Sequence, residues 1–267
     1  MEQGILLSKY IELQQTKGYY WFTRDAFIQY SACGESAFKK MANRLFHVKR
    51  IFRFAKGFYV IIPLEYRNTG LFPPILFIDY FMRYINVDYY IGLLSAVAHY
   101  GYAHQQPQRF QIITPKQLYL SKRNIAGVDA VVKYCAKMVP YHCVKVSTGY
   151  VKISSLEATA LDIVQYKSLC GGLNNVATIL AEMYAEIDPQ LLLQVYKECK
   201  YSMSTIQRLG YLLTTVGAAR VCKPLRGFVS SAKPNYTVLD VANKNSNGSK
   251  DKTWYLIINE TIEVDDI

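Results

Sequence analysis

The sequence predicts an α+β protein, an N-terminal winged helix-turn-helix followed by a larger mixed α/β C-terminal domain. Residues 1–66 combine helical spacings of apolar side chains with a basic segment and a hairpin pattern. A linker containing Gly and Pro follows at 67–76. Residues 77–267 then mix short strand-like runs with helical ones, as mixed α/β domains do.

Composition sets broad limits on this chain. Its 267 residues are enough to bury a core, and with 51% hydrophobic and 19% charged residues it is expected to fold. The longest apolar runs fall far short of the roughly 18–20 residues that a membrane-spanning helix needs. The first residues, MEQGILLSKY, lack the pattern of a signal peptide. We therefore expect a cytoplasmic protein without a membrane partner.

Two helices are predicted before residue 32. Leu6, Tyr10 and Leu13 recur at helical spacing, which predicts a helix over 3–16. A short aromatic, strand-like run comes next. Thr23 is then predicted to cap the second helix, because its side chain can accept from a free backbone N–H of the first turn.

A third helix is predicted from Glu35 to about Phe46, after a turn that contains Gly34. Its apolar stripe is Phe38, Met41 and Leu45. The outer stripe consists of Ser36, Lys40, Asn43 and His47, flanked by Lys39 and Arg44. Such side chains suit a helix laid in the major groove, where Asn can pair with adenine and Arg or Lys with guanine.

A β-hairpin is predicted next, from 51–54 and 58–62, with Gly57 in the turn. Arg53 and Lys56 lie near its tip, from which they could reach phosphates or a minor groove. Helices followed by a basic hairpin in this order predict a winged helix-turn-helix.

Charge is concentrated in the same segment. The chain has a net charge of +11, and residues 35–56 alone hold seven basic residues against one acid. This density favours binding to double-stranded DNA, because each neutralised phosphate releases counterions. The residues that we predict to contact DNA are Thr23, Arg24, Ser36, Lys39, Lys40, Asn43, Arg44, Lys49, Arg50, Arg53 and Lys56. A solvated basic face, or a protein-interaction scaffold that binds an acidic protein, is the alternative.

The larger part mixes both kinds of element. Helices are predicted over 77–85 and 90–100, and strands over 110–114, 118–120, 128–134, 141–147 and 150–153, the last two as a hairpin. Further helices are predicted after a Ser154 or Ser155 cap and over 176–187, 189–200 and 204–216. Strands over 236–241 and 254–258 follow, on either side of a polar segment at 243–250 that we expect to be mobile.

Several motifs together resemble the AbiEi family of antitoxins from type IV toxin-antitoxin systems, over about residues 5–215. They are KGFYVIIP at 56–63, YYIGLLSA at 89–96, HQQPQ at 104–108, SSLEATALDIV at 154–164, GGLNNVA at 171–177 and QRLGYL at 207–212. Ser155 stands where the family commonly has Pro.

The resemblance implies a division of labour. The winged helix would bind inverted repeats in the promoter and repress its own operon. The C-terminal part would counter a nucleotidyltransferase-like toxin without forming a stable complex with it. The resemblance implies no active-site residues for this antitoxin activity.

A metal-dependent nuclease-like enzyme is the second alternative, and it would need converging carboxylates. Asp129 lacks the required spacing to Lys133, and Glu157 and Asp162 lie about 140° apart around a helix. We interpret Glu157 as a capping residue and Asp162 as a surface residue. The six cysteines lack zinc-site spacings and are expected to be free thiols. We therefore predict no catalytic residue, metal site or cofactor.

Overall fold

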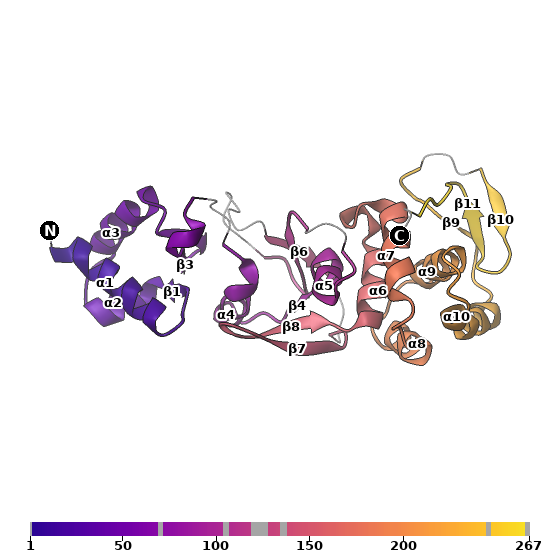
Figure 1. Cartoon of the computed structure of the whole chain (residues 1–267), viewed down its shortest axis with the longest axis horizontal. Coiled ribbons are helices and arrows are strands. Elements are labelled where there is room, and N and C mark those ends of the chain that lie inside the picture. The colour runs from indigo at the N-terminus through magenta and orange to yellow at the C-terminus, as the bar shows by residue number, and fades with distance from the viewer. Residues whose placement is uncertain are drawn as a thin grey trace.

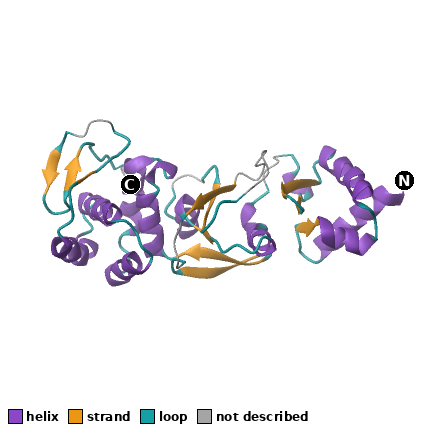
Figure 2. Ribbon diagram, turned by 180° about the vertical axis from the view of Figure 1, so that it is seen from behind, coloured by secondary structure: helices purple, strands orange, loops and turns teal. Residues whose placement is uncertain are grey.

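The structure is a computed structural model that describes residues 2–68, 72–103, 107–118, 128–133, 138–243 and 247–264. Its elements follow one another along a long axis, from the N-terminal helices, through a central sheet and a group of helices, to a small sheet near the C-terminus (Figure 1). Helices and strands are both well represented, which confirms the predicted α+β class (Figure 2).

The N-terminal elements occur in the predicted order. They are α1 (Glu2–Thr16), β1 (Trp21–Thr23), α2 (Arg24–Ser31), α3 (Glu35–His47), β2 (Ile51–Ala55) and β3 (Phe58–Ile61). The three strands form an antiparallel sheet in the order β1-β3-β2. The expected helices and hairpin are thereby confirmed as elements. That together they act as a winged helix-turn-helix stays a prediction.

Local sequence explains where these elements begin and turn. Thr23 caps α2, because its Oγ1 accepts from the N–H of Ala26 at 3.2 Å. Gly57 has a φ of +79° in the β2–β3 turn, a left-handed conformation that favours glycine. The predicted stripe of α3 is buried, with Phe38 and Met41 no more than 2% exposed.

The β2–β3 hairpin lies between two hydrophobic cores. One face presents Tyr59 and Ile61 to helices α1 to α3. The other face presents Phe52, Phe54 and Phe58 to a second core, which includes residues after the predicted linker. This packing follows from the alternation of side chains along a strand. The division of the chain at 67–76 stays a prediction, and a core crosses it.

The second core is built around a sheet and two helices. Its elements are α4 (Ile78–Tyr84), β4 (Tyr90–Ile91), α5 (Leu93–Tyr100), β5 (Phe110–Thr114), β6 (Val128–Val132), β7 (Tyr141–Val146) and β8 (Gly149–Ser154). Among the described residues, these strands form a sheet in the order β6-β5-β4-β8-β7. Single 3-10 turns occur at Leu64–Tyr66, Pro74–Leu76 and Lys167–Leu169.

The helix predicted over 90–100 is partly wrong. Tyr90 and Ile91 form a strand, antiparallel to β5 and parallel to β8, and the helix begins only at Leu93. A short apolar run does not distinguish a buried strand from a buried helix. Pairing with the neighbouring strands makes this segment a strand, because Ile91 lies between Ile112 of β5 and Ile153 of β8.

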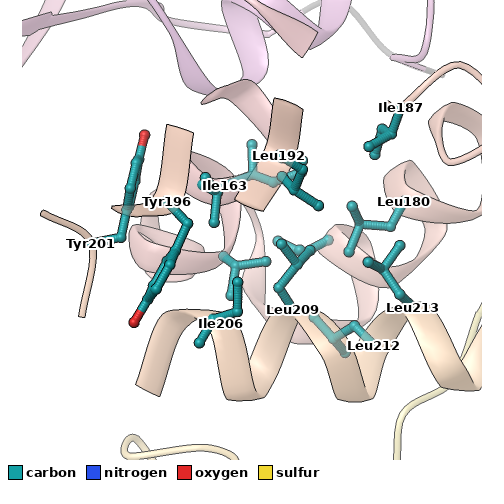
Figure 3. Packing of buried hydrophobic residues seen from close by; sticks show 14 of the residues in the cluster. Ile163, Leu180, Ile187, Leu192, Tyr196, Tyr201, Ile206, Leu209, Leu212 and Leu213 are labelled. Atoms are coloured by element: carbon teal, nitrogen blue, oxygen red, sulfur yellow. The ribbon is translucent and has the colours of Figure 1, made fainter. Parts of the chain in front are cut away.

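A layer of helices follows the sheet: α6 (Leu156–Gln165), α7 (Gly172–Met183), α8 (Pro189–Glu198), α9 (Met203–Thr215) and α10 (Ala219–Ala232). Ile163, Leu180, Leu192 and Leu209, from four of these helices, point into one core (Figure 3). Each is 0% exposed, so the predicted apolar faces are confirmed.

Two predicted helices here have different bounds, and one helix was not predicted. Helix α7 begins at Gly172 and ends at Met183, whereas the prediction was 176–187. The cap of α9 is Ser202, whose side chain accepts from Thr205, so this helix begins before the predicted Ser204. Helix α10 was not predicted; Pro224 lies inside it, where Pro normally disfavours a helix. Val221, Leu225 and Val229 on its buried face provide the tertiary contacts that override this preference.

The C-terminal strands are β9 (Thr237–Val238), β10 (Ser249–Asp251) and β11 (Leu256–Ile258), in the order β10-β11-β9. They are shorter than the predicted 236–241 and 254–258, and Ser249 and Lys250 of the expected mobile segment belong to β10. Parts of other predictions lie outside the described residues: 104–106 of the HQQPQ motif, 119–120, 134 and 244–246. None of the helices among the described residues has the length and hydropathy to span a membrane.

Candidate nucleic-acid interface

Helix α3 presents the predicted polar stripe to solvent. Its buried face packs against the other N-terminal helices, so its opposite face points outward. The exposed residues on that side are Ser36, Lys39, Lys40, Asn43, Arg44 and His47. Phe38 and Leu45 anchor the helix from within, at 1% and 6% exposure. The long basic side chains are therefore carried on a rigid element, as a nucleic-acid contact surface requires.

A groove of about 380 Å³ separates α3 from the β2–β3 hairpin. Phe38, Ala42, Phe46 and Tyr59 form its apolar floor, between the helix and β3. Its polar lining is Arg24, Glu35, Lys39, Asn43, Arg53 and Lys56. The structure thus brings five of the predicted contact residues from three elements to one groove.

Two acids compensate the charge of Arg24. Its Nε lies 2.8 Å from Asp25 Oδ1, and its Nη1 lies 2.9 Å from Glu35 Oε1. The hydrogen bond to Asp25 raises the pKa of Arg24 further above its usual value. Glu35 is the one acidic residue of the basic segment 35–56, and its carboxylate pairs with Arg24. The hydroxyl oxygen of Thr23 accepts from the N–H of Ala26 and so caps α2.

Lys49 and Arg50 lie at the other end of β2 from the hairpin turn. Lys49 occupies a left-handed conformation after α3, with φ of +52°. Arg50 Nη2 contacts Glu12 Oε1 at 3.3 Å, and Arg50 Nε is buried without a hydrogen-bond partner. Arg50 therefore joins α1 to the hairpin. The structure does not bring Lys49 or Arg50 to the groove.

The remaining basic residues keep their charge available to a ligand. No ion pair joins Lys39, Lys40, Arg44, Arg53 or Lys56 to any carboxylate among the described residues. Burial raises the pKa of Tyr59 in the groove floor, although Arg53 and Arg24 oppose that shift. The neutral phenol adds no negative charge to the groove floor. It therefore does not reduce the positive charge of the basic residues that line the groove.

The three carboxylates considered for a nuclease site do not converge. Asp162 was interpreted as a surface residue, which is wrong: it is 0% exposed, and Lys133, Tyr90 and Tyr201 bind its carboxylate. The sequence offered no signal for this, because Lys133 precedes Asp162 by 29 residues.

The other two carboxylates have different partners. Glu157 Oε1 accepts from the N–H of Asp188 at 3.3 Å, so it supports the start of α8 rather than capping its own helix, α6. Ser155 provides that cap, because its Oγ accepts from Ala158 at 3.3 Å. Asp129 forms a two-pronged ion pair with Arg109, with both N–O distances 2.6 Å. Within the described residues, no group of three potential ligands could hold a metal ion.

The QRLG motif of α9 has a structural role. Gln207 Nε2 donates to the carbonyl of Tyr255 at 3.0 Å, and Arg208 Nε donates to that of Leu239 at 2.9 Å. Gly210 lies against the ring of Trp254, where a Cβ would come within 2.2 Å of a ring carbon. These residues therefore attach the C-terminal sheet to α9.

The sequence pattern did not predict two features of the interface. The compensation of Arg24 by Glu35 could have been suspected, since the two residues carry opposite charges and begin the consecutive helices α2 and α3. No local pattern predicts the contact between Tyr84 of α4 and the hairpin turn, because Tyr84 and Gly57 lie 27 positions apart in the sequence.

Comparisons with known proteins agree with the resemblance noted from the motifs. Residues 90–215 match the family described as the AbiEi antitoxin C-terminal domain. Among curated proteins, none matches the chain. The fold is similar to the crystal structure of the RV2827C protein from Mycobacterium tuberculosis, with a TM-score of 0.65 and 16% identity, over 94% of this chain and 90% of that chain.

These comparisons differ in what they establish. At 16% identity, the solved structure shows a shared fold alone. The matched region runs from β4 to the end of α9 and includes the motifs at 154–164, 171–177 and 207–212. Residues 90–215 therefore form an AbiEi antitoxin C-terminal domain, which supports the resemblance of the chain to the AbiEi family of antitoxins.

Proposed function

We propose that this antitoxin binds double-stranded DNA at inverted repeats of its own promoter and thereby represses its operon. The outer face of α3 would enter the major groove, and Arg53 and Lys56 would contact phosphates or the adjacent minor groove. The residues involved are Ser36, Lys39, Lys40, Asn43, Arg44, Arg53 and Lys56. Lys49 could add a phosphate contact, whereas Thr23, Arg24 and Arg50 would mainly hold the interface together.

One observation carries this proposal. The exposed face of α3 and the hairpin turn border the same groove, and their basic residues lack carboxylate partners among the described residues. A helix beside a basic hairpin can contact base edges and backbone at once. Phosphate contacts in such a number produce a steep dependence of affinity on salt.

The first test replaces Lys40, Arg44 and Arg53 with Ala and measures binding to a promoter duplex at 50 and 200 mM salt. We expect the variant to lose at least about tenfold in affinity and to show a salt slope smaller by about two to three. Unchanged affinity and slope would contradict the DNA-binding face.

A matched control has the same loss of charge elsewhere. Lys145, Lys223 and Lys252 are exposed and lie in β7, α10 and the turn after β10. Replacing these three with Ala lowers the net charge equally, so it separates the local surface from the overall charge. We expect the control to bind the duplex nearly as well as the wild type.

We further propose that the toxin countered by this antitoxin is a nucleotidyltransferase-like protein, as in a type IV system, and that no stable complex forms. The support is the family of residues 90–215 and the motifs that they contain. Cells that express such a toxin from a neighbouring gene should recover growth with the full-length chain. The Lys40, Arg44 and Arg53 variant should restore growth equally, because these residues lie outside 90–215.

Two results would count against this second proposal. A failure of the full-length chain to restore growth would contradict the choice of toxin. Recovery of both proteins in one peak during size-exclusion chromatography would contradict the absence of a stable complex.

A further inference from the structure

We propose that Tyr84 of α4, which lies outside the predicted winged helix-turn-helix, is a positioning residue for DNA binding. It would hold the turn of the β2–β3 hairpin in the position from which Lys56 and Arg53 reach the duplex. The inference rests on the proposed function and names a part of the chain that this function did not include.

Tyr84 packs directly on the hairpin turn. Its ring lies 5.5 Å from the ring of Phe58, and its hydroxyl lies 3.4 Å from the carbonyl of Lys56, to which it donates. A Cβ placed on Gly57 would come within 2.5 Å of the Tyr84 hydroxyl. The hydrogen bond is long and exposed, so the covering of Gly57 and Phe58 by the ring is the stronger restraint.

Helix α4 is itself held firmly. Tyr89 donates to Asp79 Oδ1 at 3.0 Å, which joins the start of α4 to the residue before β4. The hydroxyl of Tyr80 donates to the carbonyl of Thr148 in the β7–β8 turn, and its ring stacks on Trp21 at 5.0 Å. A shift of α4 would break these contacts, so Tyr84 presents a fixed surface to the hairpin turn.

The hairpin turn needs such a restraint because its basic residues extend into solvent. Arg53 and Lys56 are exposed, and long basic side chains lose rotamer entropy when they bind. If the backbone at Lys56 also moved freely, DNA binding would have to order it as well. The contact with Tyr84 removes that cost before the duplex arrives.

The experiment measures binding of a duplex from the chain's own promoter at several salt concentrations. Tyr84→Ala should weaken binding by about three- to tenfold and reduce the salt slope by about one, as expected when one phosphate contact is lost. Tyr84→Phe retains the ring and should restore most of the affinity. Tyr236→Ala, which removes a 38% exposed ring from the C-terminal sheet region, should leave binding unchanged.

A double-mutant cycle separates positioning from a general loss of stability. In a Lys56→Ala background, Tyr84→Ala should cost clearly less affinity than in the wild type, because only the Arg53 contact is then left for Tyr84 to position. In a Lys40→Ala background, it should cost as much as in the wild type. Circular dichroism should show the same folded spectrum for all variants, and Tyr84→Leu replaces Tyr84→Ala if the latter does not fold.

The outcomes distinguish this inference from the proposed function. If the wild type binds the duplex and Tyr84→Ala matches its affinity and salt slope, the inference is wrong and the proposed function stands. Equal losses in the Lys56 and Lys40 backgrounds would also overturn it. If the wild type binds no duplex, both fail together.

Discussion

Lys133 Nζ lies 2.9 Å from Asp162 Oδ1, and both side chains are buried in the AbiEi domain. The hydroxyls of Tyr90 and Tyr201 each donate to the same carboxylate at 2.8 Å. The Lys133 ammonium also lies 3.5 Å from the centre of the Tyr201 ring. One buried charge pair thus connects β4, the end of β6, α6 and the segment before α9. It joins the sheet to the helical layer.

Removal of Asp162 should therefore be strongly destabilising. Asp162→Ala leaves the Lys133 charge buried without a partner, and we expect a loss of about 3–5 kcal/mol in the free energy of unfolding. Urea denaturation measures this loss. Asp129→Ala is the control, because its partnership with Arg109 is largely exposed and should cost about 0–1 kcal/mol. Similar losses for both variants would contradict the special role of the buried pair.

Stability should fall at alkaline pH through Cys170. Burial, reinforced by the charge of Asp162, raises the pKa of this thiol from 9.0 to about 12. The folded state therefore keeps a proton that the unfolded state releases, so stability is present below about pH 9 and is lost as the pH rises toward 12. Between pH 8 and 10.5, the wild type should lose about 2 kcal/mol more than Cys170→Ala. Equal losses in urea denaturation would contradict the prediction.

Gly210 should not tolerate a side chain. A Cβ there would come within 2.2–2.4 Å of the buried Trp254 ring, so Gly210→Ala must displace the C-terminal sheet from α9. We expect a loss of about 1–3 kcal/mol. Gly227→Ala in α10 is the matched control, since a Cβ there meets nothing within 4 Å. It should stabilise the protein by up to about 1 kcal/mol, and a lower melting temperature for Gly227→Ala than for Gly210→Ala would contradict both predictions.

A fragment that ends at residue 66 should be incompletely folded. It lacks α4, so Phe52, Phe54 and Phe58 on one face of the hairpin lose their partners. Exposing each of these rings costs about 1.5–3 kcal/mol. We expect the fragment to bind a hydrophobic dye and to unfold without a sharp transition. Sharp, cooperative unfolding without dye binding would instead show that residues 1–66 form an independent domain.

Local sequence predicted much of the N-terminal interface. The apolar stripe of α3, the cap at Thr23 and the glycine turn at Gly57 are all determined by residues within a few positions of one another. The outward direction of Lys40 and Asn43 follows from the burial of the opposite stripe. Such features are predictable because helical and strand periodicity act over one or two turns.

Other features depended on residues distant in the chain. Tyr90 and Ile91 form a strand because β5 and β8 flank them, and α10 accommodates Pro224 because its apolar face packs on the helical core. Asp162 became a buried residue through Lys133 and Tyr201, which lie 29 and 39 positions away. No local pattern contains this information.

The sequence by itself determined the class of the fold, the concentration of positive charge at residues 35–56 and the motifs of the antitoxin family. The tertiary structure decided which basic side chains of the N-terminal part remain available to a ligand. It paired Arg24 with Glu35 and Arg50 with Glu12, and it brought Lys39, Arg53 and Lys56 to one groove. The physical reason is that periodicity sets which face of an element is polar, whereas ion pairing and burial depend on which elements meet.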